Sequence, residues 1–595
     1  MNIRKILRLV YFAPILLFVS FPAGAEDFTN AIHAYLQQCI ESRKMNGCIV
    51  VGIVDEHGSR VVSCGKLDDG TDQEANGDTV FQVHSMTGTF TRLLLQDMIE
   101  RGEMKLDDPA ANYLPKSVRM PARNGKEVTL RHLAAETSGL PDFDDHLDSK
   151  RADDALGDFT IEKMDAFVSG CQLDNAPGAK HLHGGVDMGL LGQAMALKTG
   201  IDYESLMADR VFRPLKMDST RFTLTPGLKS RLAREHDDEG FGYAIPSFNW
   251  GALKPLAGLY STANDLLKFV SAFGLTPSSL TPLLNKSLAT LGYAPQVGKM
   301  IHTGGGGVGG NSYACFDKMR GRGVVILSTL DDLRPNLGNF LLESEWQSDC
   351  RPKETNIDHQ LYGSYVGQYR PTSDVIPRKF KFRPFSHHED VTASQSSIGI
   401  FREGDRLFAQ ATGPISSPAD ELLPPVAGEL LPESETRFFE RLSGRPLTFS
   451  RNGQSKVTGL TIDCQGKAFS YDKISDQPPK APEPVNTPLV IELDPKLLDA
   501  CVGRYEFAPS AVIPTGMKLT IRREGNKLVG QGFAWEGKIL KGDFDIYAGS
   551  ETNFFDRFMY AQYIFIKNGK GEVLAVIRHR VGQPDCKGKK ISGPV

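Results

Sequence analysis

The sequence predicts an α/β (α+β) domain followed by two all-β antiparallel barrel domains. Helix-period patterns mix with strand-like runs such as GVVILSTL up to about Trp346. Beyond about Pro352, short alternating strands and glycine turns dominate. At 595 residues the chain is too long for one hydrophobic core, which also favours several domains.

Composition narrows the function classes. The chain is 40% hydrophobic and 24% charged, and its formal net charge is −4. A nucleic-acid-binding protein needs a basic footprint, so we expect no nucleic-acid partner. No cofactor motif stands out either, because the run Gly304–Gly307 lacks the Lys-Ser/Thr of a phosphate loop. We therefore predict no cofactor.

The first 25 residues have the pattern of a secretory signal peptide. Arg4, Lys5 and Arg8 precede an apolar run, and Ala23-Gly24-Ala25 provides small residues for cleavage. We predict export to the periplasm or the medium, with no membrane association after cleavage. The alternative is a retained anchor, because the apolar run approaches spanning length.

The nine cysteines all follow this segment. Cys48 and Cys64 flank CIVVGIVDEHGSRVVSC, which has the pattern of a hairpin turning near His57-Gly58. In an oxidising compartment this spacing predicts a Cys48–Cys64 disulfide. Free buried cysteines are the alternative.

The β-rich part contains an internal repeat. Four segments recur in the same order, which indicates a duplicated barrel domain. They are Tyr365–Tyr369 with Cys501–Tyr505, Glu403–Gln410 with Glu524–Gln531, Ser434–Phe439 with Ser550–Phe555, and Asn452-Gly453 with Asn568-Gly569. The predicted domains are residues 26–352, 353–474 and 489–595, with a proline-rich linker at 475–488.

Several motifs of the first domain carry a family resemblance. The segments FQVHSMTGTFTRLLLQDMIERGEMKLDDPAANYLP, VTLRHLAAETSGLPDF, PGAKHLHGGVDMGLLG, GLYSTANDLLKFV and IHTGGGGVGG occur in that order. Together they resemble the penicillin-binding-protein and class C β-lactamase-related serine hydrolases, including D-aminopeptidases. The resemblance implies a β-lactamase/transpeptidase-like domain, followed as in those D-aminopeptidases by two lipocalin-like barrels.

The first family motif is Ser-x-x-Lys, in which the amine activates the hydroxyl from one helical turn away. Ser85 takes the serine position, but Gly88 takes that of the lysine. Glycine also weakens a helix by about 1 kcal/mol relative to alanine. The resemblance therefore implies a nucleophile without its usual activating group.

The second motif, Tyr-x-Asn, is replaced as well. Alignment places His183-Gly184-Gly185 there, so an imidazole replaces the phenol and the amide is lost. Glu136 stands where family members commonly have histidine before Thr-Ser-Gly, and we assign it no catalytic role.

The third motif is retained as His302-Thr303-Gly304. By resemblance, the backbone amides of Ser85 and Gly305 form an oxyanion hole, and Thr303 and Gly304 contact the ligand. Ser85, His183 and His302 are the candidate catalytic residues.

Two functions follow from this pattern. The first is a catalytically impaired or inactive protein that binds a D-amino-acid peptide-like or cell-wall-derived ligand, or a protein partner. The alternative is an active D-aminopeptidase-, amidase- or esterase-type hydrolase in which His183 acts as the base for Ser85, with Asp187 one turn further on.

The histidines also suggest a metal centre as an alternative kind of site. Convergence of His84, His183 and His302, with His181 nearby, would resemble a catalytic zinc site. His302 is already explained by the third motif, so we predict no metal.

Overall fold

The computed structural model describes most of the chain after residue 22. The described ranges are 23–43, 47–68, 70–141, 156–182, 185–236, 244–245, 247–276, 280–284, 300–306, 309–330, 341, 355–372, 397–412, 428–441, 446–464, 467–478, 490–510, 516–535, 538–556, 561–579 and 585–592. The predicted signal peptide lies outside them except for Ala23–Ala25, which open helix α1. Within these ranges, no helix is long and apolar enough to cross a bilayer.

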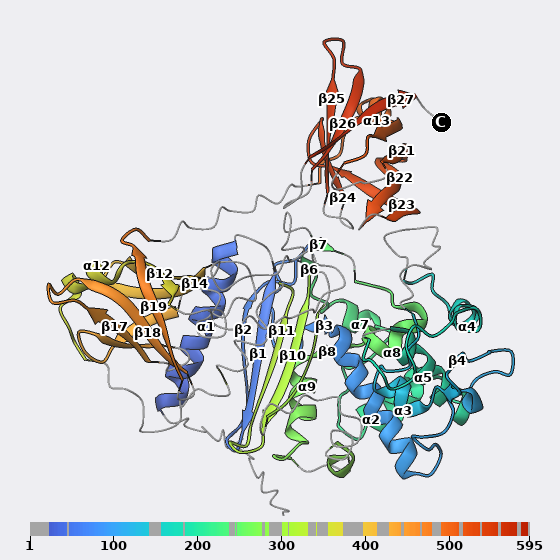
Figure 1. Cartoon of the computed structure of the whole chain (residues 1–595), viewed down its shortest axis with the longest axis horizontal. Helices are drawn as coiled ribbons and strands as arrows, with labels where there is room; N and C mark the ends of the chain where they lie inside the picture. Colours follow the sequence, from blue (N-terminus) through green and yellow to red (C-terminus); the bar gives the residue numbers. More distant parts are fainter. Residues whose placement is uncertain are drawn as a thin grey trace, which may run out of the picture.

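A five-stranded antiparallel sheet is the centre of the first domain (Figure 1). Its strand order is β2-β1-β11-β10-β9. All residues of the apolar strands β1 and β11 are buried, as expected for central strands covered on both faces. The bounds are β1 Cys48–Asp55, β2 Gly58–Gly65, β9 Met300–Gly306, β10 Asn311–Asp317 and β11 Arg322–Ser328.

Helices cover both faces of this sheet. Helix α1 (Ala23–Arg43) packs Ile32 and Leu36 against one face. Helix α9 (Ala263–Ser271) packs Leu267 against the other, so closely that a Cβ at Gly52 of β1 would lie 2.8 Å from a Leu267 methyl carbon. The predicted arrangement of helices on a sheet is thus confirmed.

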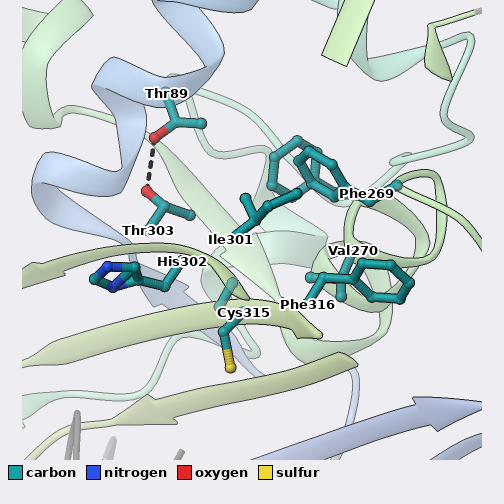
Figure 2. A pocket seen from close by; sticks show the side chains of 10 residues that line it. Thr89, Phe269, Val270, Ile301, His302, Thr303, Cys315 and Phe316 are labelled. Carbon is teal, nitrogen blue, oxygen red and sulfur yellow. Dashed lines mark hydrogen bonds between the residues drawn. The ribbon is translucent and has the colours of Figure 1, made fainter. Parts of the chain in front are cut away.

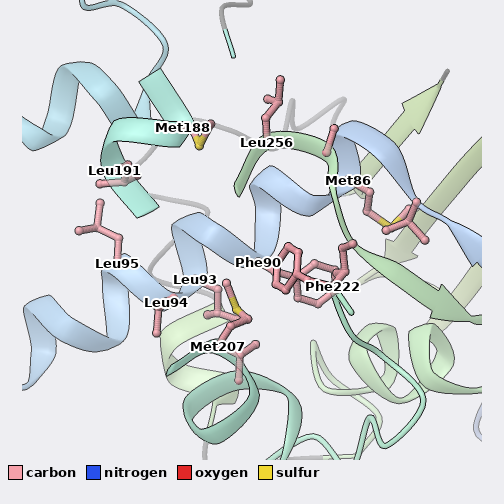
Figure 3. Close-up of a cluster of buried hydrophobic side chains, with 14 of the residues drawn as sticks. Met86, Phe90, Leu93, Leu94, Leu95, Met188, Leu191, Met207, Phe222 and Leu256 are labelled. Atoms are coloured by element: carbon pink, nitrogen blue, oxygen red, sulfur yellow. The ribbon is translucent and has the colours of Figure 1, made fainter. Parts of the chain in front are cut away.

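Helix α2 (Thr87–Glu100) runs through the helical part of the same domain. Leu93, Leu94 and Leu95 point in different directions from it and are all buried (Figure 3). The helix is thus buried on several sides within the domain, and this placement fixes the residues at its N-terminus. The other elements of the domain are β3 Val80–Gln82, η1 His84–Met86, η2 Ala110–Tyr113, β4 Ala122–Arg123, β5 Lys126–Glu127, α3 Leu130–Ala134, α4 Ile161–Gly170, α5 Gly185–Thr199, α6 Tyr203–Met207, η5 Ala208–Phe212, α7 Pro226–Lys229, β6 Glu235–His236, β7 Ala244–Ile245, η6 Gly251–Leu253, α8 Lys254–Ala257 and β8 Tyr260–Thr262.

The predicted hairpin forms, but its disulfide does not. Strands β1 and β2 pair around a turn at residues 56–57, while Cys48 and Cys64 are both free. The register places Cys64 opposite Ile49. Because side chains alternate between faces, Cys64 packs with Ile49 beside α1, whereas Cys48 packs in the core on the other face. The predicted Cys48–Cys64 bond was therefore wrong by one residue of register.

Two closed antiparallel barrels of eight strands each form the C-terminal part of the chain. A short helix precedes each barrel, α12 (Tyr362–Tyr365) after η7 (His359–Leu361) for the first and α13 (Pro495–Cys501) for the second. The strands of the first barrel are β12 Gly367–Pro371, β13 Ser397–Glu403, β14 Arg406–Thr412, β15 Gly428–Pro432, β16 Arg437–Glu440, β17 Pro446–Arg451, β18 Val457–Cys464 and β19 Lys467–Ser475. Those of the second are β20 Gly503–Phe507, β21 Met517–Glu524, β22 Lys527–Trp535, β23 Lys538–Ala548, β24 Asn553–Asp556, β25 Gln562–Lys567, β26 Val573–His579 and β27 Cys586–Ser592.

The two barrels repeat each other in detail, as the duplicated segments predict. In each, a buried tyrosine hydroxyl donates a 2.6 Å bond to a carbonyl four residues earlier, Tyr369 to Tyr365 and Tyr505 to Cys501. The register shifts at matching places, after Gln368 in the first barrel and after Arg504 in the second. Of the predicted linker 475–488, only the first four residues lie within the described ranges. The domain boundaries stay predictions.

Candidate functional site

Ser85 lies in the 3₁₀ turn η1, directly before helix α2. Its side chain is partly exposed, whereas His84 and Met86 on either side are buried. The turn is held by the Val83 amide, which donates to the Leu259 carbonyl at 2.8 Å. Two buried neighbours and a fixed backbone present the Ser85 hydroxyl at the N-terminal end of a rigid helix.

Gly305 on β9 lies against this turn. A Cβ at Gly305 would lie 2.6 Å from the Ser85 amide nitrogen and would collide with the Val83 carbonyl oxygen, so only glycine fits there. The Ser312 hydroxyl on β10 donates to that same carbonyl at 2.7 Å. The structure therefore brings Ser85 and Gly305 together, as the sequence predicts.

Thr303 and His302 occupy opposite faces of β9 (Figure 2). The Thr303 hydroxyl lies 2.6 Å from that of Thr89 on α2, beside a cavity of about 20 Å³. His302 pairs with Cys315 across the strands, and its ring centroid is 6.3 Å from that of Tyr313. Burial lowers the pKa of His302, and its Nε2 has no hydrogen-bond partner among the described residues. Thr303 thus faces helix α2, whereas His302 does not (Figure 2).

Arg92 occupies the space beside Gly88. A Cβ at Gly88 would lie 2.8 Å from the Arg92 Nη1 atom, because Arg92 follows one turn later on α2 and its guanidinium folds back over the glycine. Arg92 is 1% exposed. Sequence reasoning missed this residue, because nothing in the local pattern tells a buried arginine from an exposed one.

Glu136 holds that guanidinium. Its Oε1 atom lies 2.5 Å from Arg92 Nη2, and Arg92 Nε donates to the Ala134 carbonyl at 2.6 Å. Glu136 is 0% exposed and has a left-handed backbone, with φ of 52°. Its carbonyl accepts from the Leu182 amide at 2.9 Å. The residue thus connects α2 to the segment that leads into the second motif.

A second carboxyl group lies near this ion pair. Asp187, in the first turn of α5, accepts a 2.5 Å bond from the Ser138 hydroxyl. Burial raises the pKa of Asp187 to about 8, and the charge of Glu136 adds to the rise. Burial therefore favours the neutral form of Asp187 in this cluster.

The remaining members of the second motif are only partly described. His183 and Gly184 lie outside the described residues, and Gly185 begins α5. Asp187 is the candidate orienting acid for His183, and its Oδ1 accepts the hydrogen bond of the Ser138 hydroxyl.

His84 pairs with a residue that sequence reasoning did not single out. Its Nε2 lies 2.7 Å from Glu235 Oε1, and both side chains are buried. His84, one of the candidate metal ligands, is therefore already in contact with a carboxyl group. Among the described residues, no group of three or more His, Cys, Asp or Glu side chains is placed to hold a metal ion.

A partly exposed serine at the start of a buried helix, against a glycine of an antiparallel strand, is the arrangement that the serine hydrolase motifs predict. The model of the β-lactamase family matches residues 32–341, which is the whole sheet and the helical part. The chain belongs to the β-lactamase family.

Known relatives match this part of the chain. The β-lactamase of Escherichia coli (strain K12) is 28% identical over 267 residues, covering 44% of this chain and 63% of that protein. The D-alanyl-D-alanine-carboxypeptidase/endopeptidase AmpH of the same organism is 29% identical over 211 residues, covering 36% and 53%. Penicillin-binding protein 4 of Amycolatopsis lactamdurans is 30% identical over 213 residues, covering 35% and 54%. The matches thus span about half to just under two thirds of these relatives.

A solved structure is also similar. The β-lactamase/D-alanine carboxypeptidase from Yersinia pestis, complexed with citrate, is 21% identical with a TM-score of 0.44, covering 51% of this chain and 93% of that one.

Proposed function

We propose that this chain is an exported member of the β-lactamase family that lacks the standard serine hydrolase mechanism and binds a D-amino-acid peptide-like ligand or a protein partner. The observation that carries the proposal is the position of Arg92. Its guanidinium fills the space beside Gly88, one turn from Ser85. A guanidinium keeps its proton in proteins and cannot accept one from a serine hydroxyl. In serine triads, loss of the activating partner lowers turnover by about 10⁴- to 10⁶-fold.

The binding half of the proposal rests on strand β9. It is one of the two edge strands of the sheet within the described residues, and it carries Thr303, Gly304 and Gly305 beside Ser85. An edge strand offers a row of backbone donors and acceptors to an extended peptide. Gly305 packs closely against the Ser85 amide, and we expect a peptide carbonyl at this point to accept from the backbone N–H groups of both residues.

A second candidate is an active hydrolase of D-amino-acid peptides, amides or esters, in which His183 acts as base. The observation in its favour is the retained contact between Gly305 and the Ser85 amide, which a serine hydrolase needs for its oxyanion. Both candidates share export, which the composition of residues 1–25 supports.

One experiment separates the two candidates. The mature protein and its Ser85→Ala variant are incubated with a reporter penicillin and, separately, a fluorophosphonate, and intact masses are measured. No adduct on folded wild-type protein is the expected result. An adduct on the wild type that Ser85→Ala abolishes would reject impairment and direct attention to His183.

Binding is tested separately by calorimetry with N-acetyl-D-alanyl-D-alanine. We expect binding that the L,L isomer does not reproduce and that Gly305→Ala abolishes, because the added methyl group would collide with the Val83 carbonyl. Equal binding of both isomers, or none, would reject the D-peptide ligand and leave the protein partner.

A further inference from the structure

Gly88, Arg92 and Glu136 contact one another in sequence close to η1, the turn that carries Ser85. Ser85, Gly88 and Arg92 are spaced by three and then four residues, which places them on one side of the η1–α2 segment. Glu136 reaches the same place from the turn after α3 and holds the guanidinium at 2.5 Å. Two of these three residues, Gly88 and Glu136, are also the ones that depart from the family pattern.

The first link in the unit is steric. At 2.8 Å, Arg92 Nη1 is the nearest atom to a Cβ at position 88, and the next is Arg92 Cζ at 3.9 Å. The third nearest atom is the Leu256 carbonyl oxygen, which belongs to the backbone. Among these three atoms, only the Arg92 guanidinium nitrogen is too close for a Cβ at position 88.

The second link is electrostatic. Glu136 is fully buried, and a buried carboxylate without a cation is strongly unfavourable. The Ala134 carbonyl also fixes Arg92 by its 2.6 Å bond, so the guanidinium is held at two points. A side chain that replaced Arg92 in this space would therefore have to carry a positive charge.

We propose that Arg92 is an inhibitory occupant of the site, and that exchange of Gly88 and Arg92 for a lysine and a small residue would give an activated Ser85. This inference rests on the proposed impairment and goes beyond it, because it assigns the loss of the activating amine to one exchangeable side chain. The exchange conserves charge and puts one long cationic side chain where another lies now. Glu136 keeps a cationic partner.

The step that the exchange would enable is β-lactam opening. The new lysine first gives one proton to the Glu136 carboxylate, which leaves a neutral buried pair. The amine then takes the proton of Ser85 Oγ while that oxygen bonds to the lactam carbonyl carbon. The ring C–N bond breaks, and the proton passes from the amine to the ring nitrogen. The adduct therefore carries the whole mass of the penicillin.

The test compares the exchange variant Gly88→Lys/Arg92→Ala with the matched control Gly88→Ala/Arg92→Ala, which removes the guanidinium without supplying an amine. Each is incubated as the full mature chain with a reporter penicillin, and adduct formation is timed by intact mass. We expect the exchange variant to react at least roughly tenfold faster than the wild type and the control. A further Ser85→Ala substitution should abolish the adduct.

A folded exchange variant that reacts no faster than its control would overturn the inference and leave the proposed impairment standing. Reaction of the wild type would instead reject the proposed impairment. The inference would then stand only if the exchange variant still reacted roughly tenfold faster than the wild type and the control. If the exchange variant does not fold, Gly88→Lys/Arg92→Met retains a long apolar side chain at position 92 and takes its place. Failure of both to fold would show that lysine cannot occupy this space, which also overturns the inference.

Discussion

His84 and Glu235 are 151 positions apart, yet the imidazole Nε2 lies 2.7 Å from the Glu235 Oε1 atom. His84 has a left-handed backbone with φ of 48°, which is uncommon for a residue with a side chain. Glu235 packs directly on Gly310, just before strand β10. The pair therefore connects the turn that carries Ser85 to the residues that follow strand β9.

Breaking this pair is expected to destabilise the protein. His84→Ala leaves the buried Glu235 carboxylate without its partner, and we expect a loss of about 3 kcal/mol in the free energy of unfolding. Glu235→Gln keeps a hydrogen-bonding side chain of the same shape, so its cost should be about 1 kcal/mol. Urea denaturation of the two variants checks this order, and equal costs would show that the contact carries no charge.

A second prediction concerns Gly88 and Arg92. Alanine is favoured over glycine in a helix by about 1 kcal/mol, but in the wild type the added methyl group meets the Arg92 guanidinium at 2.8 Å. Gly88→Ala should therefore lower stability alone and raise it when Arg92→Ala is already present. The expected coupling in this double-mutant cycle is about 1 to 3 kcal/mol. Additive effects would mean that the two side chains do not share the space.

A third prediction follows from Asp187. Its pKa is raised from 3.8 to about 8, mainly by burial, so the folded state holds a proton that the unfolded state releases above about pH 4. Stability from this group is thus fully present below about pH 4 and falls as pH rises towards 8, by at most about 1.4 kcal/mol per pH unit. Above pH 8 its contribution is constant.

The measurement is the difference in unfolding free energy between Asp187→Asn and wild type across this range. The difference should move in favour of the variant from about pH 4 to pH 8 and then level off. Ser138→Ala is the informative companion. The Ser138 bond lowers the pKa of Asp187, so its removal should extend the slope above pH 8. A constant difference between pH 4 and 8 would contradict the assignment.

Local sequence patterns were enough to predict the two barrels and the part of the candidate site around Ser85. Ser85, Thr303 and Gly305 belong to short segments whose neighbours fix their backbone, and the structure places them about one helix start. The duplicated barrels were predictable because each turn and buried tyrosine recurs in the chain itself.

The rest depends on contacts between distant segments. Arg92 and Glu136 meet across 44 positions, and neither has a local pattern that marks it as buried. Cys64 failed as a disulfide partner through one residue of strand register, which the hairpin sequence leaves open. Glu235 stands in a two-residue strand, too short for any periodicity.

The interior of the second barrel differs from that of its twin. Tyr563 and Arg578 are neighbours across β25 and β26, and the Tyr563 hydroxyl donates to Asp556 at 2.8 Å. By the same register, the first barrel has Leu447 and Ile462 at those positions. All five side chains are buried. The barrel fold itself therefore does not require polar groups at these two positions. At the position of Asp556, however, the first barrel has Glu440, which is also buried.

This comparison predicts how the second barrel responds to substitution. Arg578→Ile alone removes the buried guanidinium beside Tyr563, the hydrogen-bond partner of Asp556, and we expect a loss of roughly 3 kcal/mol in stability. Replacing all three polar residues, by Asp556→Leu, Tyr563→Leu and Arg578→Ile, removes the uncompensated charge and should recover most of that loss. The measurement is calorimetry of the full chain, which follows the unfolding transition whose midpoint temperature Arg578→Ile lowers. A triple variant no more stable than the single one would mean that the polar cluster, and not apolar packing, holds this end of the barrel together.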